Sequence, residues 1–352
     1  MDVVWMIVFL VIILSVLVFV HEGGHYLVAR ALGVRVTEFM LGFPGPNIGF
    51  TWHGTKFGVT AVPLGGYARV CGMEPGEESP HLAGLMRVVY EHGTIDMEDA
   101  ARELGISDDD AFAGLEQLVD WGTVEMPRKT DDYNTYRAPA RDGYESGQAR
   151  DVPDEQALYE SERSQQYRSL GFFKRCAILL AGPGMNLLFA IVMFVLIYSV
   201  MGFDVVDQAT NEVRHITVDP GRAIMAGFDY IGAVFIAILG LFNPQTAAET
   251  VSNSTSIVGI AVMSKSAFDA GLANFLSFSA MISVSLGLMN MLPIPPLDGG
   301  RFIIEIYQLI VRRNITTRAL NALSLAGMAL FIGFFILMVN QDIQRFVFGN
   351  WG

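Results

Sequence analysis

The stretch FVHEGGHYLVAR, Phe19 to Arg30, places two histidines and a glutamate directly after a long apolar run. Val3–Val20 contains no charged residue, and its length is close to the roughly 20 residues that a helix needs to cross the hydrocarbon core of a bilayer. An ionisable side chain at the centre of a bilayer costs about 2.5–3.5 kcal/mol on insertion scales. His21, Glu22 and His25 at the end of such a run therefore indicate a functional site.

The spacing of these residues is typical of metal binding. His21 and His25 lie four residues apart, so they share one face of a helix and can bind one ion through imidazole nitrogens. Glu22 is rotated by about 100° from His21, close enough to reach a water on the ion but not placed as a ligand. This HExxH pattern is that of zinc peptidases, in which zinc acidifies a water and the glutamate accepts its proton. Gly23 and Gly24 leave room for another backbone near the metal.

The whole chain has the composition of a membrane protein. Of its 352 residues, 52% are hydrophobic and only 17% are charged, below the roughly one quarter that is usual in soluble domains. Three further runs approach the length of a membrane span: Ile178–Val200, Phe275–Leu297 and Leu320–Val339. Tyr230–Phe242, with about 13 residues, is more typical of an interfacial or re-entrant helix. The expected fold is an α-helical integral membrane protein with about four transmembrane helices.

Basic residues beside the spans predict the orientation of the chain, because cytoplasmic loops carry an excess of Lys and Arg. They follow the first span, precede the second, and lie between the third and fourth: Arg30, Arg35, Lys174, Arg175, Arg301, Arg312, Arg313 and Arg318. We therefore expect both termini outside the cell and the segment after the first span in the cytoplasm. Cys71 and Cys176 fall on the cytoplasmic side, where free thiols are expected.

Two segments between the first and second spans differ in character. Val34–Met73 is rich in Gly, aromatic and β-branched residues, which predicts β-hairpins at the membrane face. Glu74–Arg168 reads as a soluble α+β insert of three helices followed by two strands, which resembles a winged-helix domain. Within it, Ala138–Arg168 is polar and acidic, and we expect it to be a linker.

The insert carries the negative charge of the protein. Residues 74–168 contain 23 acidic and nine basic residues, a net charge of −14, against −13 for the whole chain. DNA binding normally needs a basic face, whereas the helix in the recognition position begins Asp108-Asp109-Asp110. We therefore expect a protein partner for this insert rather than DNA; a passive spacer is the remaining alternative.

A catalytic zinc usually has three protein ligands, so a third must come from elsewhere in the chain. Asp298, in LGLMNMLPIPPLDGGR, is the one acid at the edge of another apolar span, and Asn290 lies eight residues before it. Pro293 and the Pro295–Pro296 pair should break the helix between them. An unwound segment at membrane depth has to line a cavity or be buried in protein. The simpler alternatives are a helix-end carboxylate at Asp298 and an interhelical hydrogen bond from Asn290.

The pairing of HEGGH with NMLPIPPLDGG resembles the site-2 protease family of intramembrane zinc metalloproteases, most closely its bacterial RseP-type branch. That family combines HExxH with N-x-x-P-x-x-x-x-D-G, and Asn290, Pro293, Asp298 and Gly299 match this spacing. VPLGGYARVCGM resembles its membrane-associated β-hairpin, and FKRCAILLAGPGMNLLFAI resembles the start of its second span.

The resemblance implies a zinc metalloendopeptidase of the bacterial inner membrane, with Zn²⁺ held by His21, His25 and Asp298 and with Glu22 as the general base. Its substrates would be single-span membrane proteins, such as anti-sigma factors, cut within the transmembrane segment. An unwound substrate would pair with the edge of the Leu64–Val70 strand. The implied substrate-binding residues are Gly65, Gly66, Tyr67, Asn290 and Pro293.

The RseP-type branch usually carries PDZ domains between the second and third spans, but Phe203–Ala226 is too short for one. The expected parts are residues 1–73 (first span and β-region), 74–168 (insert and linker), 169–202 (second span), 203–227 (short extracytoplasmic loop) and 228–352 (interfacial helix, third and fourth spans). Two alternatives remain: a catalytically silent membrane sensor or scaffold that acts through its insert, and a soluble-style zinc peptidase tethered to the bilayer.

Overall fold

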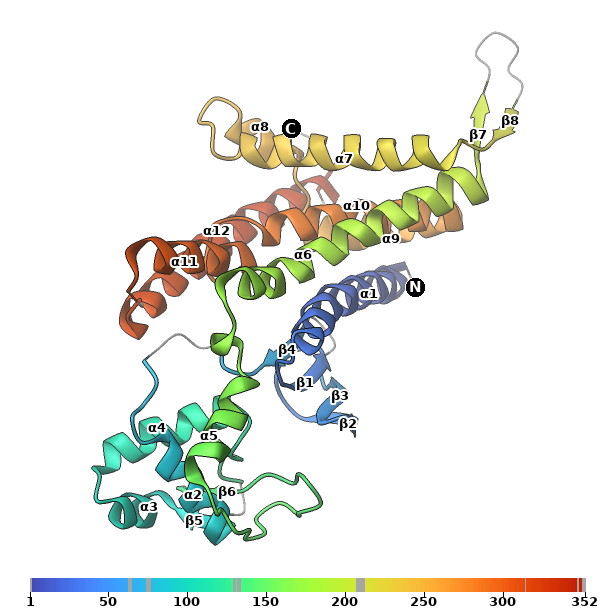
Figure 1. Ribbon diagram of the computed structural model, residues 1–352. Helices are drawn as coiled ribbons and strands as arrows, with labels where there is room; N and C mark the ends of the chain where they lie inside the picture. The colour runs from blue at the N-terminus through green and yellow to red at the C-terminus, as the bar shows by residue number, and fades with distance from the viewer. Residues whose placement is uncertain are drawn as a thin grey trace.

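The computed structural model describes residues 2–62, 65–73, 77–128, 131, 134–206, 213–313, 315–346 and 348–349. Leu64 and Glu74, the expected first residues of a strand and of the insert, lie outside these ranges. The long helices pack side by side, and the small sheet and the insert lie at one end of them (Figure 1).

Five helical segments in the described part of the chain are long and apolar enough to cross a membrane. They are α1 (Asp2–Ala31), α6 (Phe172–Val195) with the π-helical turn η2 (Leu196–Met201), α7 (Pro220–Gly240), α10 (Leu272–Asn290) and α12 (Thr317–Phe346). Shorter helices are α8 (Ala247–Asn253), α9 (Ile257–Asp269) and α11 (Asp298–Val311). The chain is therefore a multi-pass membrane protein, as expected.

Helix α7 is longer than the sequence suggests. Asp219 caps its first turn by accepting a hydrogen bond from the Gly221 amide at 2.9 Å, and Pro220 occupies the first helical position, where proline is favoured. The preceding loop contains a two-stranded hairpin, β7 (Phe203–Val206) and β8 (Val213–Ile216). The 21 residues of α7 would suffice for a span, so its length does not support the expected interfacial helix.

The segment from α7 to α9 begins and ends on one side of the helical body. It starts beside the end of η2, where the Val218 amide donates to the Tyr198 carbonyl at 2.9 Å. It ends beside the first turn of α1, where Lys265 Nζ lies 3.7 Å from Asp2 Oδ1. Since α1 and α6 run antiparallel, the end of η2 and the start of α1 lie on the same side of the helical body. The chain therefore enters and leaves the segment from α7 to α9 on the same side, and the expected number of four membrane spans stays a prediction.

The β-region forms one four-stranded sheet rather than separate hairpins. Its strands are β1 (Val36–Leu41), β2 (Asn47–Trp52), β3 (Thr55–Thr60) and β4 (Gly66–Val70), in the order β2-β3-β1-β4. β2 and β3 form the expected hairpin, whereas β1 pairs in parallel with β3 and antiparallel with β4. β4 is consequently an edge strand. A Cβ on Gly66 would lie 2.6 Å from Val18 Cγ1, so glycine is what allows β4 to lie against α1.

The insert comprises α2 (Leu82–His92), β5 (Thr94–Asp96), α3 (Met97–Leu104), α4 (Asp108–Asp120), β6 (Thr135–Arg137) and α5 (Glu155–Ser164). The three predicted helices are present, and Ser107 caps α4 by accepting a hydrogen bond from the Asp110 amide at 3.1 Å. The expected strand pair after α4 differs: β6 pairs with β5, and Glu125 makes a single bridge to Arg137. The winged-helix classification stays a prediction.

The segment predicted to be a linker contains a packed helix and a buried charge. α5 packs against α2, and Glu162 is buried against Arg35, whose Nη1 lies 2.6 Å from Glu162 Oε2. The same Nη1 donates to the Trp121 carbonyl at 3.3 Å, which links the insert to the residue that precedes β1. The linker expectation failed because its acidic composition does not reveal a partner 127 residues away.

The predicted third span is interrupted as its prolines indicate. α10 ends at Asn290, residues 291–297 form a turn, and α11 begins at Asp298. Side chains at Gly299 and Gly300 would collide with this turn; a Cβ on Gly300 would lie 2.6 Å from the Ile294 carbonyl carbon. The two glycines therefore let the chain double back and bring Asp298 to the first turn of α11.

Candidate metal centre

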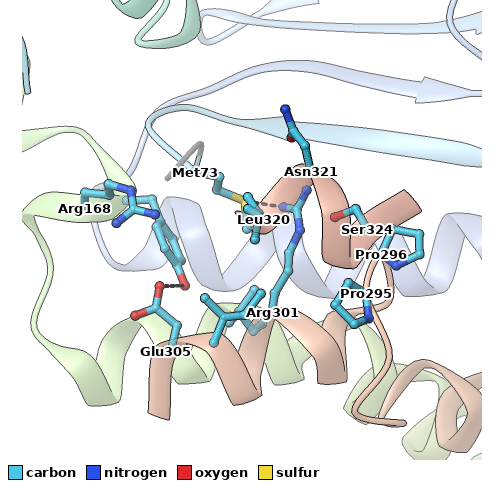
Figure 2. A pocket seen from close by; sticks show the side chains of 12 residues that line it. Met73, Arg168, Pro295, Pro296, Arg301, Glu305, Leu320, Asn321 and Ser324 are labelled. Atoms are coloured by element: carbon cyan, nitrogen blue, oxygen red, sulfur yellow. Dashed lines mark hydrogen bonds between the residues drawn. The ribbon is translucent and has the colours of Figure 1, made fainter. Parts of the chain in front are cut away.

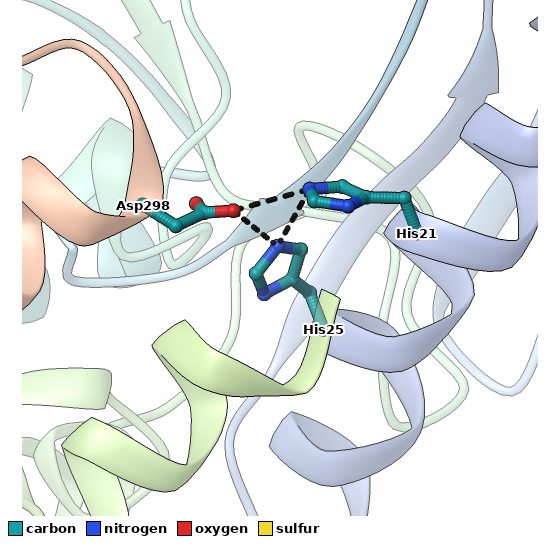
Figure 3. A group of neighbouring side chains, drawn as sticks. All are labelled: His21, His25 and Asp298. Atoms are coloured by element: carbon teal, nitrogen blue, oxygen red, sulfur yellow. Dashed lines mark hydrogen bonds and ion pairs between the residues drawn. The ribbon is translucent and has the colours of Figure 1, made fainter. Parts of the chain in front are cut away.

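Three side chains from the two ends of the sequence converge on one point (Figure 3). His21 and His25 project from one face of α1, and Asp298 projects from the first turn of α11. Asp298 Oδ2 lies 3.1 Å from His21 Nε2 and 3.3 Å from His25 Nε2, and the two Nε2 atoms are 3.4 Å apart. The structure thus brings together the three residues that the sequence predicts as metal ligands.

The spacing of these atoms fits a zinc ion. Ligands at 2.0–2.1 Å in a tetrahedral site are about 3.3 Å from one another, close to the three separations in the structure. Both histidines are buried, whereas the Asp298 side chain is 19% exposed. A tetrahedral ion bound to these atoms would keep one position for water or substrate, as in catalytic zinc sites.

The orientation of His25 is fixed from behind by α6. His25 Nδ1 lies 2.8 Å from the Ile178 carbonyl oxygen, which can only accept a hydrogen bond. Nδ1 therefore carries the proton, and in the neutral ring the lone pair of Nε2 points toward the metal position. A side chain at Gly182 would collide with the His25 ring, so this glycine lets α6 pack directly on the ligand.

His21 has a supporting contact that the sequence reading missed. Asn186 of α6 is fully buried, and its Nδ2 lies 3.2 Å from His21 Nδ1. One signal was available, since Asn186 is the only amide side chain in the apolar run Ile178–Val200. Its position opposite His21 depends on how α6 packs against α1, which no local pattern encodes.

Glu22 lies beside the ligand cluster without being part of it, as its helical position predicts. Its Oε2 accepts a hydrogen bond from the Ala68 amide of β4 at 2.8 Å. The adjacent glycines behave differently from one another. A side chain at Gly24 would collide with the Ala181 carbonyl of α6, whereas one at Gly23 would meet nothing within 4 Å. The space beside Gly24 is therefore filled by α6, the second span of the protein.

The residues predicted to bind substrate lie in two places. The Gly65 carbonyl accepts a hydrogen bond from the Gly42 amide at 2.8 Å, and Tyr67 Oη donates to Glu38 Oε2 at 2.9 Å. Because main-chain groups alternate along a strand, Gly65 and Tyr67 face β1, and Gly66 and Ala68 face the free edge of β4.

The other two residues, Asn290 and Pro293, lie at the end of α10 and in the turn that follows it. Asn290 Nδ2 donates to the Leu286 carbonyl of its own helix at 3.0 Å. This is not an interhelical bond. The substrate-binding roles of these two residues, and of the three residues on β4, stay predictions.

Two cavities lie on the side of the core that faces the insert. The smaller, about 270 Å³, is bounded by residues of α11 and α12 and by the chain that leaves the insert (Figure 2). The larger, about 610 Å³, lies between β4 and α4. Met73, Arg168 and Arg301 line both, so the two cavities adjoin. Neither is lined by His21, His25 or Asp298.

A helix that is apolar up to its HExxH motif, with the carboxylate of Asp298 close to both histidines, is the arrangement expected of a membrane-embedded metallopeptidase. The motif lies within the span itself, which argues against a soluble-style peptidase on a tether.

Comparison with known proteins gives the family. The sequence profile of Peptidase family M50 matches residues 9–334. The chain is 27% identical to a candidate zinc metalloprotease of Agrobacterium fabrum over 364 residues, which covers 96% of this chain and 95% of that protein. It is 24% identical to the zinc metalloprotease RasP of Oceanobacillus iheyensis (95% and 98% covered) and 25% identical to RasP of Shouchella clausii (95% and 97% covered).

The chain belongs to peptidase family M50, the site-2 proteases, in the branch that includes the RasP proteins. It is a zinc metalloendopeptidase of the membrane, and its substrates are membrane proteins. The alternative of a catalytically silent sensor has no support, because the motif residues of an active enzyme are all present.

Proposed function

We propose that this protease hydrolyses a peptide bond within the transmembrane segment of its substrate. The observation that carries the proposal is the convergence of His21, His25 and Asp298 beside α1, the most apolar of the five candidate spans. Ionisable groups without a role are costly at that depth. A metal centre there has its reacting bond inside the bilayer.

In this proposal His21, His25 and Asp298 hold Zn²⁺. When bound, the ion supplies Lewis acidity that acidifies water and polarises the scissile carbonyl. Glu22 accepts the proton of the attacking water and returns it to the amine leaving group. Because Glu22 follows His21 directly on α1, the geometry of the helix fixes its carboxylate beside the ligand cluster without making it a ligand.

The free edge of β4 is the proposed binding surface for an unwound substrate strand. In the structure the outward amide of Ala68 on this edge donates to Glu22 Oε2. A paired substrate strand needs the same amide for one of its own carbonyls. Substrate binding would therefore release Glu22 from β4 as the scissile bond arrives, which links binding to proton transfer.

The remaining predicted residues fit around this strand. Gly66 lies on the free edge, and its lack of a side chain keeps β4 close to α1. Gly65 and Tyr67 hold the opposite edge of β4 to β1. We propose that the Asn290 amide leaves the Leu286 carbonyl to hold the substrate main chain, and that Pro293 keeps the segment before Asp298 unwound.

The positions of the basic residues support an orientation with the N-terminus outside and residues 74–168 in the cytoplasm of a bacterial inner membrane. A single-span protein, such as an anti-sigma factor, is the kind of substrate that fits this arrangement. Its cytoplasmic flank would emerge on the side where the insert lies.

The larger cavity connects the edge of β4 to the insert. Ala68 and Val70 line one side of it, and Glu116 and Val119 of α4 line the other. Its wall carries charges of both signs. The acidic residues are Glu77, Glu78, Glu116 and Asp120, and the basic residues are Arg69, Arg168 and Arg301. We propose that the polar flank of the substrate runs through this cavity.

The insert would then be a protein-binding domain. The first turn of α4 consists of Asp108, Asp109 and Asp110, all exposed, which repel a phosphate backbone. DNA binding therefore remains the less favoured role for it.

The test is cleavage of a designed single-span substrate by the purified full-length protein in liposomes. We expect the cut to map within the span, and the Glu22→Gln variant to leave the substrate intact while it binds zinc normally. Equal cleavage by Glu22→Gln, or cuts confined to the flanks, would contradict the proposal.

A further inference from the structure

Asn186 is a buried side-chain amide that lies against His21. Its Nδ2 faces His21 Nδ1 at 3.2 Å, and its Oδ1 is buried without a hydrogen-bond partner among the described residues. A buried amide atom that lacks a partner costs about 1–3 kcal/mol in either assignment of the oxygen and nitrogen, so this cost does not choose between them. The amide oxygen and nitrogen are nearly indistinguishable in shape, so their assignment has to follow from the hydrogen bonds.

The two assignments of the Asn186 amide require different tautomers of His21. If Nδ2 donated to Nδ1, the ring proton of a neutral His21 would lie on Nε2, which points at His25 Nε2 3.4 Å away and at the metal position. With the oxygen facing the ring instead, Nδ1 carries the proton and the Nε2 lone pair is directed at the metal. Only the second arrangement allows His21 to act as a ligand.

The neighbours of Asn186 hold it rigidly in this position. Ser283 Oγ of α10 donates to the Asn186 carbonyl at 2.8 Å. A Cβ on Gly287, also on α10, would lie 3.3 Å from Asn186 Cβ, so the two helices are in close contact here. The Ser283 bond is to the main-chain carbonyl, so these contacts fix the backbone of Asn186 against α10, and the side-chain amide then lies beside His21.

We infer that Asn186 is a positioning residue that sets the tautomer of His21 by accepting its Nδ1 proton. The inference rests on the metal site proposed above. Helix α6 then orients both histidine ligands, His25 through the Ile178 carbonyl and His21 through the Asn186 side chain. Partners of this kind typically change metal affinity by 10–100-fold.

The test is a zinc-affinity measurement on the full-length protein in detergent, by competition with a chromogenic chelator. Asn186→Leu keeps the size but removes the acceptor, and we expect zinc binding to weaken by about 10–100-fold. Asn186→Asp keeps an acceptor oxygen, and we expect affinity within about threefold of wild type. Wild-type affinity in Asn186→Leu, or an equal loss in both variants, would overturn the inference.

Two further variants serve as controls for the zinc-affinity measurement. Ser279→Ala removes a buried hydroxyl of α10 that bonds only to its own helix, at the Phe275 carbonyl, and should leave zinc affinity unchanged. His25→Ala tests the site itself: if it binds zinc as wild type does, the proposed metal site fails regardless of Asn186. If Asn186→Leu does not fold, Asn186→Ser, whose hydroxyl is too short to reach His21, takes its place with the same expected loss.

Discussion

The imidazole Nδ1 of His25 lies 2.8 Å from the carbonyl oxygen of Ile178, so a main-chain group of the second span orients a candidate metal ligand of the first. This contact is possible because Gly24 and Gly182 let α1 and α6 approach each other closely. The catalytic helix is therefore not a self-contained motif, and changes in α6 should alter metal binding without touching a ligand.

Glu22→Gln should lower the cleavage rate by at least about 10²–10⁴-fold, the range that general-base catalysis contributes. Zinc content should not change, because Glu22 lies outside the ligand cluster. The measurement is cleavage of a single-span substrate together with metal analysis of the same preparation. A variant that loses its zinc would show that Glu22 supports the ligands rather than the reaction.

Gly182→Ala should weaken zinc binding, because the added Cβ collides with the His25 ring and forces it to move. Gly184→Ala is the matched control: it lies two residues away on the same helix, and its Cβ would meet nothing within 4 Å. Both changes favour the helix by about 0.5–1 kcal/mol, so a difference between them reports the collision alone. Chelator competition measures it; equal affinities would mean that α6 does not constrain His25.

Glu162→Ala should release the insert from the sheet, since it leaves the Arg35 guanidinium buried and unpaired at a cost of about 3–5 kcal/mol. Cys71 reports the release. The Gly122 turn of the insert covers its sulfur, and burial raises the pKa of the Cys71 thiol to about 11, so the reactive thiolate is scarce while the insert stays in place.

We expect maleimide labelling of Cys71, in a Cys176→Ser background, to rise at least about tenfold in Glu162→Ala. Asp99→Ala is the control, because it removes an exposed ion pair with Arg102 that contributes little. Slow labelling in both variants would show that the Arg35–Glu162 pair does not hold the insert in place.

Glu77→Lys should reduce cleavage of substrates with a Lys/Arg-rich cytoplasmic flank by several-fold at low salt, because it reverses a charge on the wall of the larger cavity. The same variant should favour a substrate whose flank is acidic. Glu145→Lys, exposed and outside that wall, makes the same charge change as a control. If both variants shift the preference equally, the effect comes from net charge and the flank does not use this cavity.

The three candidate metal ligands, which the structure brings together, stand out in the sequence because the bilayer makes ionisable groups rare. His21 and His25 stand out at the end of Val3–Val20, and Asp298 is the one acid at the edge of a distant apolar run. Pro293 and the Pro295–Pro296 pair also predicted the break between α10 and α11. These signals are local, and each arises from a residue type that its surroundings would otherwise exclude.

The structural features that could not be predicted from the sequence depend on contacts between distant segments. The β1–β3 pairing is parallel and the β1–β4 pairing spans the whole region, whereas alternating patterns suggest only adjacent hairpins. In the sequence, Glu162 is one of many acidic residues in a polar segment, and only the structure shows that Arg35 lies beside it. Asn186 gains its significance only when α6 packs against α1.

The central claim is that residues from opposite ends of the chain hold one zinc ion, and the zinc content of purified Asp298→Ala protein tests it most directly. We predict one zinc per chain in the wild type and in Glu22→Gln, and almost none in Asp298→Ala or His25→Ala, with all four proteins eluting alike on size-exclusion chromatography. One zinc per chain in Asp298→Ala, bound as tightly as in the wild type, would contradict the account.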